Sequence, residues 1–411
     1  MIDKKATTQY ALSILRKHFL SIPEKLRRVT SGGKFINEID GLRFVAIIPV
    51  LIQHMTERFE RNTSINFAKP EEGNFLSFLA SRGFLGVYIF FVISGFILAL
   101  PFASHYLKQK KKVPLKNYFW RRLTRLEPPY IIWMSVFFIL FLFARHESFS
   151  SYFPHYLANI TYTHTLIYKE WSPFDPPTWT LEIEVQFYIL APFLSYLFFS
   201  VKNKMRRRVI NLVAVTVLML LQQYLQFYAR PYNFTILGHL HYFLVGFFLA
   251  DIFLEDWNST PIKGNGRFDV IAIIALITLL FGWSWDFVWY SRILVVTALF
   301  LFFYSAFKSR YVNRFLCNRW ITAIGGMCYT IYLIHLPFSE LLIAITKKIH
   351  FTQFYAPNLL LQLLIFIPLI LIISAFCFLL LEKPFMDKNW PKRFYQKIIQ
   401  FFSKSEVRTD Q

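Results

Sequence analysis

Cysteine is scarce in this chain: Cys317, Cys328 and Cys377 are the three cysteines among 411 residues. So few cysteines, with no paired spacing, exclude a disulfide framework and a cysteine-based zinc site, and we expect no bound metal. The first 36 residues contain no long apolar run, so we expect no cleavable signal peptide. No repeat, low-complexity tract or interdomain linker divides the rest of the sequence.

Acidic residues are also few, since 24 Asp and Glu stand against 45 Lys and Arg, and the formal net charge is +21. That charge alone would suit nucleic acid or an anionic membrane surface as a partner. The chain is 55% hydrophobic, however, and apolar runs of bilayer-spanning length recur from end to end. We therefore predict one all-α, polytopic membrane domain that binds no nucleic acid. Its ten predicted spans are residues 43–58, 84–103, 128–144, 181–200, 209–228, 235–254, 268–286, 292–307, 321–343 and 358–381.

The basic residues gather on one side of these predicted spans. They cluster at residues 1–43, 108–125, 202–208 and 308–319, and again after residue 383. Because cytoplasmic loops carry an excess of Lys and Arg, we predict that both termini are cytoplasmic. The expected divisions are a basic N-terminal segment (1–36), a membrane domain (37–386) and a basic tail (387–411).

Two ionisable residues share the first predicted span. Arg43 and His54 are eleven residues apart. Eleven residues make about three helical turns, so both side chains point to nearly the same face, roughly 16 Å apart along the axis. The predicted topology puts Arg43 near the cytoplasmic surface and His54 deep in the membrane. Since ionisable groups within a membrane are costly, we interpret this pair as functional.

Two further groups suggest binding. Arg122 and Arg125 are three residues apart and share a face if their segment is helical. Paired guanidiniums can grip phosphate oxygens, although simple anchoring at the cytoplasmic surface also explains them. The predicted outer loop at residues 145–180 is rich in aromatic side chains, including Trp179. These suit either an interfacial belt or a sugar-binding surface, and both interpretations stay open.

Six short motifs occur in a fixed order along the chain. They are Asp40-Gly41-Leu42-Arg43 followed by His54, Gly86 to Phe96 with Ser94-Gly95, Arg122 to Tyr130, Trp179 to Tyr188, Gly325 to Pro337, and Leu381 to Phe385. With this order and spacing over residues 36–386, the chain resembles the acyltransferase-3 family of membrane proteins, which O-acylate surface polysaccharides, lipopolysaccharide and related glycans. Two positions depart from the family pattern. Cys328 stands where a small hydroxyl residue is common, and Tyr88 stands where an acidic residue is common.

The resemblance implies a donor, an acceptor and a location. The donor would be cytoplasmic acyl-coenzyme A, most often acetyl-coenzyme A. The acceptor would be a glycan hydroxyl, as in lipopolysaccharide O-antigen or a lipid-linked sugar. The protein would lie in a bacterial inner membrane as a multi-pass O-acetyltransferase. The sequence ends soon after the tenth predicted span, so we expect no fused hydrolase-like domain. Whether the protein forms a homo-oligomer is left open.

The same resemblance gives each candidate residue a role. His54 would be the general base, because imidazole ionises near neutral pH, and Arg43 and Glu184 would complete the catalytic group. Arg122, Arg125 and Arg43 would bind the phosphates of the donor. The acceptor would meet Glu184, Trp179, Tyr332 and His335, although packing explains the last two equally well. Helix packing is the favoured role for Ser94-Gly95, and no metal is assigned to His239 and His241.

Other functions remain as alternatives. Ten spans with buried charges also fit a transporter of glycans or acyl donors that carries out no chemistry of its own. A third alternative is O-acylation of a small secreted metabolite. The sequence does not identify the sugar, its hydroxyl or the length of the acyl chain.

Overall fold

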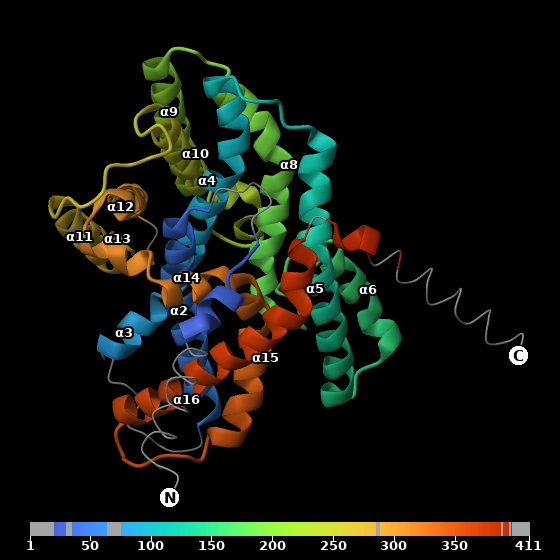
Figure 1. The fold of residues 1–411 in the computed structure, drawn as a ribbon. Coiled ribbons are helices and arrows are strands. Elements are labelled where there is room, and N and C mark those ends of the chain that lie inside the picture. Colours follow the sequence, from blue (N-terminus) through green and yellow to red (C-terminus); the bar gives the residue numbers. More distant parts are fainter. Residues whose placement is uncertain are drawn as a thin grey trace, which may run out of the picture.

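The protein is a bundle of helices that contains no strand within the residues described, as seen in a computed structural model of the chain. The structure describes residues 20–29, 35–63, 75–284, 288–387, 389–393 and 396. This architecture confirms the all-α prediction (Figure 1). In chain order the elements are α2 (Asn37–Asn62), α3 (Phe75–Ser81), α4 (Leu85–Lys108), α5 (Leu115–Arg145), α6 (Phe149–Ile160), α7 (His164–Tyr168), η1 (Pro176–Thr178), α8 (Trp179–Phe199), α9 (Lys204–Tyr224), η2 (Tyr232–Phe234), η3 (Ile236–Gly238), α10 (Leu240–Glu255), α11 (Arg267–Gly282), α12 (Trp289–Lys308), α13 (Tyr311–Leu316), α14 (Arg319–Gly326), α15 (Cys328–Thr346), α16 (Tyr355–Cys377), η4 (Phe378–Glu382) and η5 (Lys383–Met386).

Every predicted span overlaps a helix, but not every one of these helices is long and apolar enough to cross a membrane. Seven segments of the described chain meet that condition: Asn37–Asn62, Phe75–Lys108, Leu115–Arg145, Pro176–Phe199, Trp289–Lys308, Cys328–Thr346 and Tyr355–Met386. Two of the others, α10 and α11, have 16 residues each. A helix of that length extends about 24 Å, less than the roughly 30 Å of a hydrocarbon core. The polytopic membrane character is confirmed, whereas the count of ten spans and the cytoplasmic termini stay predictions.

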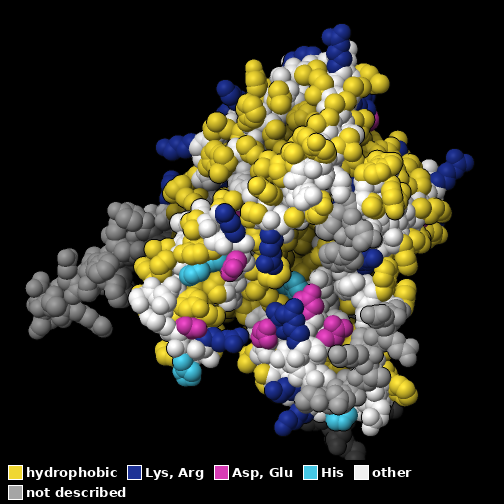
Figure 2. Space-filling view, turned by 180° about the vertical axis from the view of Figure 1, so that it is seen from behind, with side chains coloured by type: hydrophobic (Ala, Val, Ile, Leu, Met, Phe, Trp, Pro, Cys, Tyr) yellow, Lys and Arg dark blue, Asp and Glu magenta, His cyan; other side chains and the backbone are white. Residues whose placement is uncertain are grey.

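Rows of exposed apolar side chains support the membrane assignment. On α11, Val270, Ile273, Ile274 and Ile277 are each at least half exposed, and their spacing places them on one helix face. Comparable rows lie on α9 and α16. Figure 2 shows hydrophobic side chains over most of the upper half of one face, while acidic side chains gather in its lower half. Such outward apolar faces are favourable against lipid tails and unfavourable against water.

Helix α2 lies at the centre of the bundle, where it contacts α4, α14, α15 and α16 (Figure 1). It continues through Pro49 and is longer than the predicted span of residues 43–58. Two glycines let its neighbours approach closely: a side chain on Gly86 would overlap the Ala46 carbonyl, and one on Gly325 would overlap the Asp40 carbonyl. These contacts fix the register of α2 against α4 and α14, and so fix where its polar side chains point.

Two hydrophobic clusters form the core. One is built mainly from α4, α8, α10 and α12, and the other mainly from α2, α5, α15 and α16. Phe90 on α4 is half-buried and packs against both clusters. Gly95 joins α4 to α10, because a side chain there would overlap the Phe243 carbonyl. This contact is the packing role predicted for Gly95.

One predicted span is not continuous. The sequence predicts a single segment at residues 321–343, but α14 ends at Gly326 and α15 begins at Cys328. Met327 lies between them with φ −92° and ψ 5°, outside the α-helical region. Just before the break, Gly325 lies against the backbone of Asp40. The predicted outer loop at residues 145–180 contains α6, α7 and η1.

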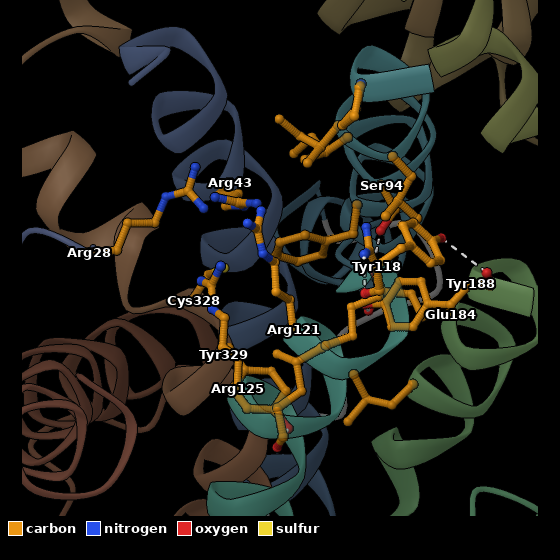
Figure 3. Close-up of a pocket in the computed structure, with 18 of the residues that line it drawn as sticks. Arg28, Arg43, Ser94, Tyr118, Arg121, Arg125, Glu184, Tyr188, Cys328 and Tyr329 are labelled. Atoms are coloured by element: carbon orange, nitrogen blue, oxygen red, sulfur yellow. Dashed lines mark hydrogen bonds between the residues drawn. The ribbon is translucent and has the colours of Figure 1, made fainter. Parts of the chain in front are cut away.

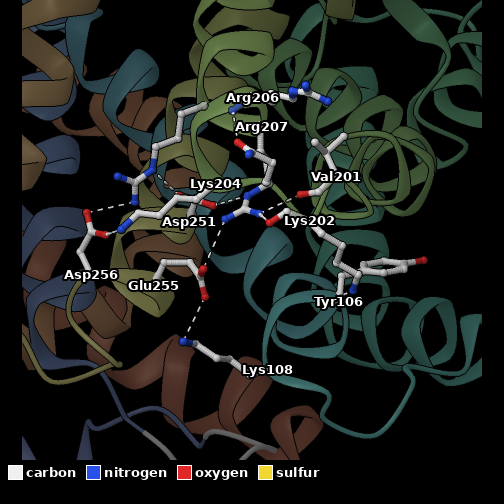
Figure 4. Close-up of polar contacts among 12 residues, drawn as sticks. Tyr106, Lys108, Val201, Lys202, Lys204, Arg206, Arg207, Asp251, Glu255 and Asp256 are labelled. Atoms are coloured by element: carbon white, nitrogen blue, oxygen red, sulfur yellow. Dashed lines mark hydrogen bonds and ion pairs between the residues drawn. The ribbon is translucent and has the colours of Figure 1, made fainter.

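A buried ion-pair network joins α9 to α10 on the predicted cytoplasmic side (Figure 4). Asp251 accepts hydrogen bonds from Arg207 Nε at 2.5 Å and from Arg208 Nε at 2.6 Å. Arg207 and Asp251 are both buried. Asp256 pairs with Lys204 and Arg208 at the more exposed rim. The basic segment at residues 202–208 therefore has a packing role in addition to its predicted role in topology.

Replacing Asp251 with alanine is expected to lower the free energy of unfolding by about 3–5 kcal/mol, because it removes the nearest carboxylate of a buried guanidinium and leaves only Glu255, at 3.6 Å. The matched control is Asp256→Ala, whose 31% exposed carboxylate should contribute about 0–1 kcal/mol. Thermal unfolding of the purified full chain in detergent measures both. Equal, small losses in the two variants would contradict a structural role for the buried pair.

Candidate active site

A cavity of about 660 Å³ lies where the two hydrophobic clusters meet, with α2, α4, α5, α8 and α15 around it. Both basic and aromatic side chains line it. We call the part lined by Lys111, Lys112 and the arginines the basic end, and the part lined by Val87, Phe90, Leu181 and Tyr332 the aromatic end. Under the predicted topology, the basic end faces the cytoplasm and the aromatic end lies within the membrane.

The basic end holds seven cationic side chains, against two acidic ones among the described lining residues of the whole cavity. The seven are Arg28, Arg43, Lys111, Lys112, Arg121, Arg122 and Arg125. Figure 3 shows Arg28, Arg43 and Arg121 directed toward the same space from different segments. Such an excess of forked guanidiniums is suited to a ligand with several phosphate groups.

Asp40 holds two of these arginines in place. Its carboxylate lies 2.9 Å from Arg28 Nε and 2.5 Å from Arg43 Nη1. Burial, followed by the charge of Arg43, lowers the pKa of Arg28 to about 10. Arg28 is therefore still a cation at neutral pH, and one buried carboxylate is shared between two guanidiniums. The resulting surplus of positive charge favours an anionic ligand.

Arg122 and Arg125 are both on the cavity side of α5, as their spacing predicts. The Arg122 guanidinium lies 3.6 Å above the Tyr118 ring and donates to the Tyr118 carbonyl at 3.0 Å. The Nε of Arg125 is buried and makes no hydrogen bond to any described residue. A buried hydrogen-bond donor without a partner is costly, so Arg125 Nε is suited to donate a hydrogen bond to an oxygen atom of a bound ligand.

The middle of the cavity carries a carboxylate. Glu184 on α8 accepts a hydrogen bond from the Ser94 hydroxyl and another, at 3.1 Å, from the Tyr188 hydroxyl. Figure 3 shows these three side chains together, apart from Arg28 and Cys328. Ser94 therefore belongs to the site, although the sequence favours packing for Ser94-Gly95. The i, i+4 spacing of Glu184 and Tyr188 is a signal that could have identified this pair.

The aromatic end is closed by Tyr332 and its neighbours. The Tyr332 hydroxyl donates to the Pro177 carbonyl at 2.8 Å and lies 2.7 Å from Thr180 Oγ1. Phe90 packs near it with a ring-centroid distance of 6.4 Å. Two hydrogen bonds hold Tyr332 in one position, whereas Phe90 is held by apolar contacts alone.

His54 and His335 meet just beyond this end. Nδ1 of His54 lies 2.7 Å from Nε2 of His335, and the two ring planes are 13° apart with their centroids at 4.9 Å. Nδ1 of His335 lies 2.6 Å from the Tyr332 carbonyl oxygen. His335 is fully buried. The two histidines are 281 residues apart in sequence, and α2 and α15 bring them together.

These contacts determine which nitrogens carry protons. A carbonyl oxygen only accepts, so Nδ1 of His335 carries a proton. In a neutral ring the other nitrogen, Nε2, then has the lone pair and accepts from Nδ1–H of His54. Nε2 of His54 is left as the basic nitrogen of the pair. His335 thus fixes the tautomer and orientation of His54, as a histidine's second hydrogen bond commonly does.

Comparison with known proteins agrees with this architecture. The acyltransferase domain of the acyltransferase-3 family matches residues 36–382. The chain belongs to the acyltransferase-3 family. This finding confirms the resemblance seen in the motifs, and the match covers the helices that form the cavity and the histidine pair.

Individual relatives are distant. The O-acetyltransferase OatA of Staphylococcus aureus (strain NCTC 8325 / PS 47) is 26% identical over 334 residues, which cover 74% of this chain and 50% of OatA. A protein of Staphylococcus aureus (strain COL) with the provisional name O-acetyltransferase SACOL0978 is 25% identical over 333 residues, with the same coverage. The chain thus spans about half the length of these relatives. No solved structure gives a significant match.

The structure brings most of the acyltransferase-3 candidate residues together. Arg43, Arg122, Arg125, Glu184 and Tyr332 line one cavity, and His335 contacts His54 directly. Glu184 does not meet His54 in the described contacts, because its two hydrogen bonds go to other partners within the cavity. Its position favours contact with the ligand of the cavity over orientation of the histidine.

Trp179 lies apart from this group. It packs against Phe234 at 6.1 Å and His239 at 5.7 Å, and it does not line the cavity. Its predicted contact with an acceptor stays a prediction. The sequence analysis also did not identify four basic residues of the cavity, Arg28, Lys111, Lys112 and Arg121. A topological role accounts for basic residues in these segments, and no spacing distinguishes those that face the cavity.

Proposed function

We propose that this protein is an O-acetyltransferase of the bacterial inner membrane. It transfers an acetyl group from cytoplasmic acetyl-coenzyme A to a hydroxyl of a cell-surface glycan such as lipopolysaccharide O-antigen. The observation that carries the proposal is a cavity within the membrane bundle with seven cations at its basic end and a histidine pair just beyond its aromatic end. The acetyl group is supported by the names of the relatives, which are O-acetyltransferases.

The basic end supports the choice of donor. Coenzyme A carries several phosphate groups, and the guanidiniums of Arg28, Arg43 and Arg125 converge from three segments on one space. Charge-assisted and bidentate hydrogen bonds to phosphate are among the strongest available to a protein. Between the mouth and the histidines, Glu184 and Ser94 offer polar contacts in an otherwise largely apolar channel, which suits the amide groups of the donor's flexible arm.

The chemistry needs a base near the thioester carbon. Nε2 of His54 takes the proton from the acceptor hydroxyl as its oxygen attacks the acetyl carbonyl. The new C–O bond forms, the C–S bond breaks, and the coenzyme A sulfur leaves and takes up a proton. While His54 is protonated, its Nδ1–H donates to Nε2 of His335, so the positive charge that develops is shared through a short hydrogen bond.

The direct test uses the purified full chain in lipid nanodiscs with acetyl-coenzyme A, in the presence and absence of lipopolysaccharide. We expect release of free coenzyme A thiol only with both substrates, together with a mass increase of one acetyl group on the glycan. Movement of the donor or glycan across the membrane without thiol release would instead support the transporter alternative and reject this proposal.

Arg125→Gln should raise the donor KM by about 10- to 100-fold, because a charge-assisted hydrogen bond contributes about 1.5–3 kcal/mol. The turnover number should change little, since Arg125 lies at the phosphate end. Arg206→Gln is the matched control, because Arg206 is an exposed arginine of α9 and does not line the cavity. Steady-state kinetics with varied donor concentration separates the two constants. A fall in turnover without a change in KM would contradict phosphate binding by Arg125.

A further inference from the structure

A segment that precedes the family domain contributes to the donor cavity. Residues 20–29, which we call the strap, come before residues 36–382, the part of the chain that matches the family. Arg28 of the strap is nevertheless one of the cationic side chains that line the basic end. The family match therefore does not account for this arginine, and its position depends on how the strap is held against the bundle.

One side of the strap packs against the helices around the cavity. Leu26 is 7% exposed and belongs to the hydrophobic cluster of α2, α5, α15 and α16. A side chain on Gly326 would lie 3.7 Å from the Arg28 backbone nitrogen, and Gly326 itself lines the cavity. The strap therefore lies beside the break between α14 and α15, at the wall of the donor cavity.

Two hydrogen bonds join the strap to η5, which begins directly after the family match ends. The Lys383 ammonium donates to the Lys25 carbonyl, and the Val29 N–H donates to the Met386 sulfur at 3.4 Å. None of these four residues is among the described lining residues of the cavity. What they contribute to the donor site is the position of the strap, and with it the position of Arg28.

The charges around Arg28 couple the strap to an anion in the cavity. Arg28 Nε lies 2.9 Å from Asp40, but the same carboxylate also binds Arg43. The charges of Arg43 and Arg125 both disfavour the positive charge of Arg28. An anionic group bound among these guanidiniums relieves the repulsion, and more strongly where water is excluded. A bound phosphate therefore stabilises the docked strap, and by linkage the docked strap raises phosphate affinity by the same factor.

We propose that the strap is part of the donor site. Arg28 binds a phosphate group of coenzyme A, and the anchoring of the strap by Leu26 and Lys383 sets the affinity for the donor. This role rests on the proposed function and adds residues outside the family domain to its donor site. Coenzyme A should make the strap harder to detach, and loosening the strap should weaken donor binding without any change to the other cavity residues.

The test measures the donor KM and kcat of the full chain in lipid nanodiscs, with acetyl-coenzyme A and lipopolysaccharide as substrates. We expect Arg28→Gln to raise the donor KM by about 10- to 100-fold, the effect of one charge-assisted hydrogen bond. Leu26→Ala should raise it at least about fivefold, the lower end of coupling between sites. In both variants kcat should change little. Ile22→Ala is the matched control and should keep the wild-type KM, because Ile22 is 37% exposed in the same strap.

Tryptic cleavage after Lys25 reports the docking of the strap directly. Coenzyme A alone should slow this cleavage in the wild-type chain and have little effect in Arg28→Gln at the same concentration. The double variant gives a second readout. If Leu26 acts through Arg28, Leu26→Ala should add almost nothing to the KM of Arg28→Gln, whereas independent effects would multiply.

Each outcome decides the inference. Multiplying effects in the double variant, equal KM changes in Leu26→Ala and Ile22→Ala, or wild-type cleavage that coenzyme A does not slow would each overturn it. If Leu26→Ala does not fold, the cleavage of the wild type and of Arg28→Gln decides. Failure of the proposed function shows differently, as absence of acetyl transfer by the wild-type chain, and the cleavage assay then still tests the strap.

Discussion

Replacing His54 with alanine is expected to lower kcat/KM for acetyl transfer by about 10²- to 10⁴-fold, the range that a positioned general base contributes. The loss should appear mainly in the turnover number, because the groups that line the donor cavity are unchanged. Transfer is measured as coenzyme A thiol release with purified protein and as glycan acetylation by mass spectrometry in cells that produce the variant.

The control for this prediction is His350→Ala, since His350 is exposed and its ring bonds only to the nearby Lys348 carbonyl in the described contacts. This variant should keep wild-type activity. Normal acetylation by His54→Ala at normal protein levels would show that another group takes the acceptor proton, and the role of base would have to be reassigned.

The second large effect is expected at His335, which in the proposed mechanism is a positioning residue that acts through His54. His335→Ala removes the acceptor for Nδ1–H of His54, so the imidazole is free to adopt the other tautomer and to rotate. We expect kcat to fall by about 10²-fold, near the lower end of what a positioned base contributes, with little change in the donor KM. His335→Gln should recover part of the loss, because its side-chain oxygen can accept the same hydrogen bond.

A purely structural role for His335 gives a different pattern. Alanine and glutamine would then lower thermal stability and activity in parallel, and KM would rise with the loss of packing. Thermal unfolding measured beside the kinetics separates the two cases. Equal kcat values for the alanine and glutamine variants would reject the proposed hydrogen-bonding role.

Features carried by a single helix were largely predictable from the sequence. The apolar run after Asp40 predicts a helix that places Arg43 and His54 on one side, and α2 has that form. The spacing of Arg122 and Arg125 predicts a shared face, and both line the cavity. These predictions succeed because 3.6-residue periodicity is a local property of the chain.

Features that depend on contacts between distant segments were not predictable. Ser94 and Glu184 meet across 90 residues, and no local spacing indicates their contact. Arg28 reaches the cavity because Asp40 binds it, although it lies well before the first helix of the membrane domain. The close approach of Gly325 to Asp40 on α2 likewise has no local signal. In each case the contact depends on how distant segments pack together, and no local pattern in a single sequence predicts that packing.

The uneven exposure of the seven cations has a kinetic consequence. Lys111, Lys112 and Arg121 are exposed at the mouth, whereas Arg43 lies deeper, beside buried Asp40. At about 0.1 M ionic strength, charges in solvent are screened beyond roughly 10 Å, and buried charges are screened much less. Added salt should therefore lower the association rate of a polyanionic thioester more than it raises the dissociation rate of one that is already bound. Under the proposed function, the outer cations speed the encounter with the donor by electrostatic attraction, and the inner cations hold the donor once it is bound.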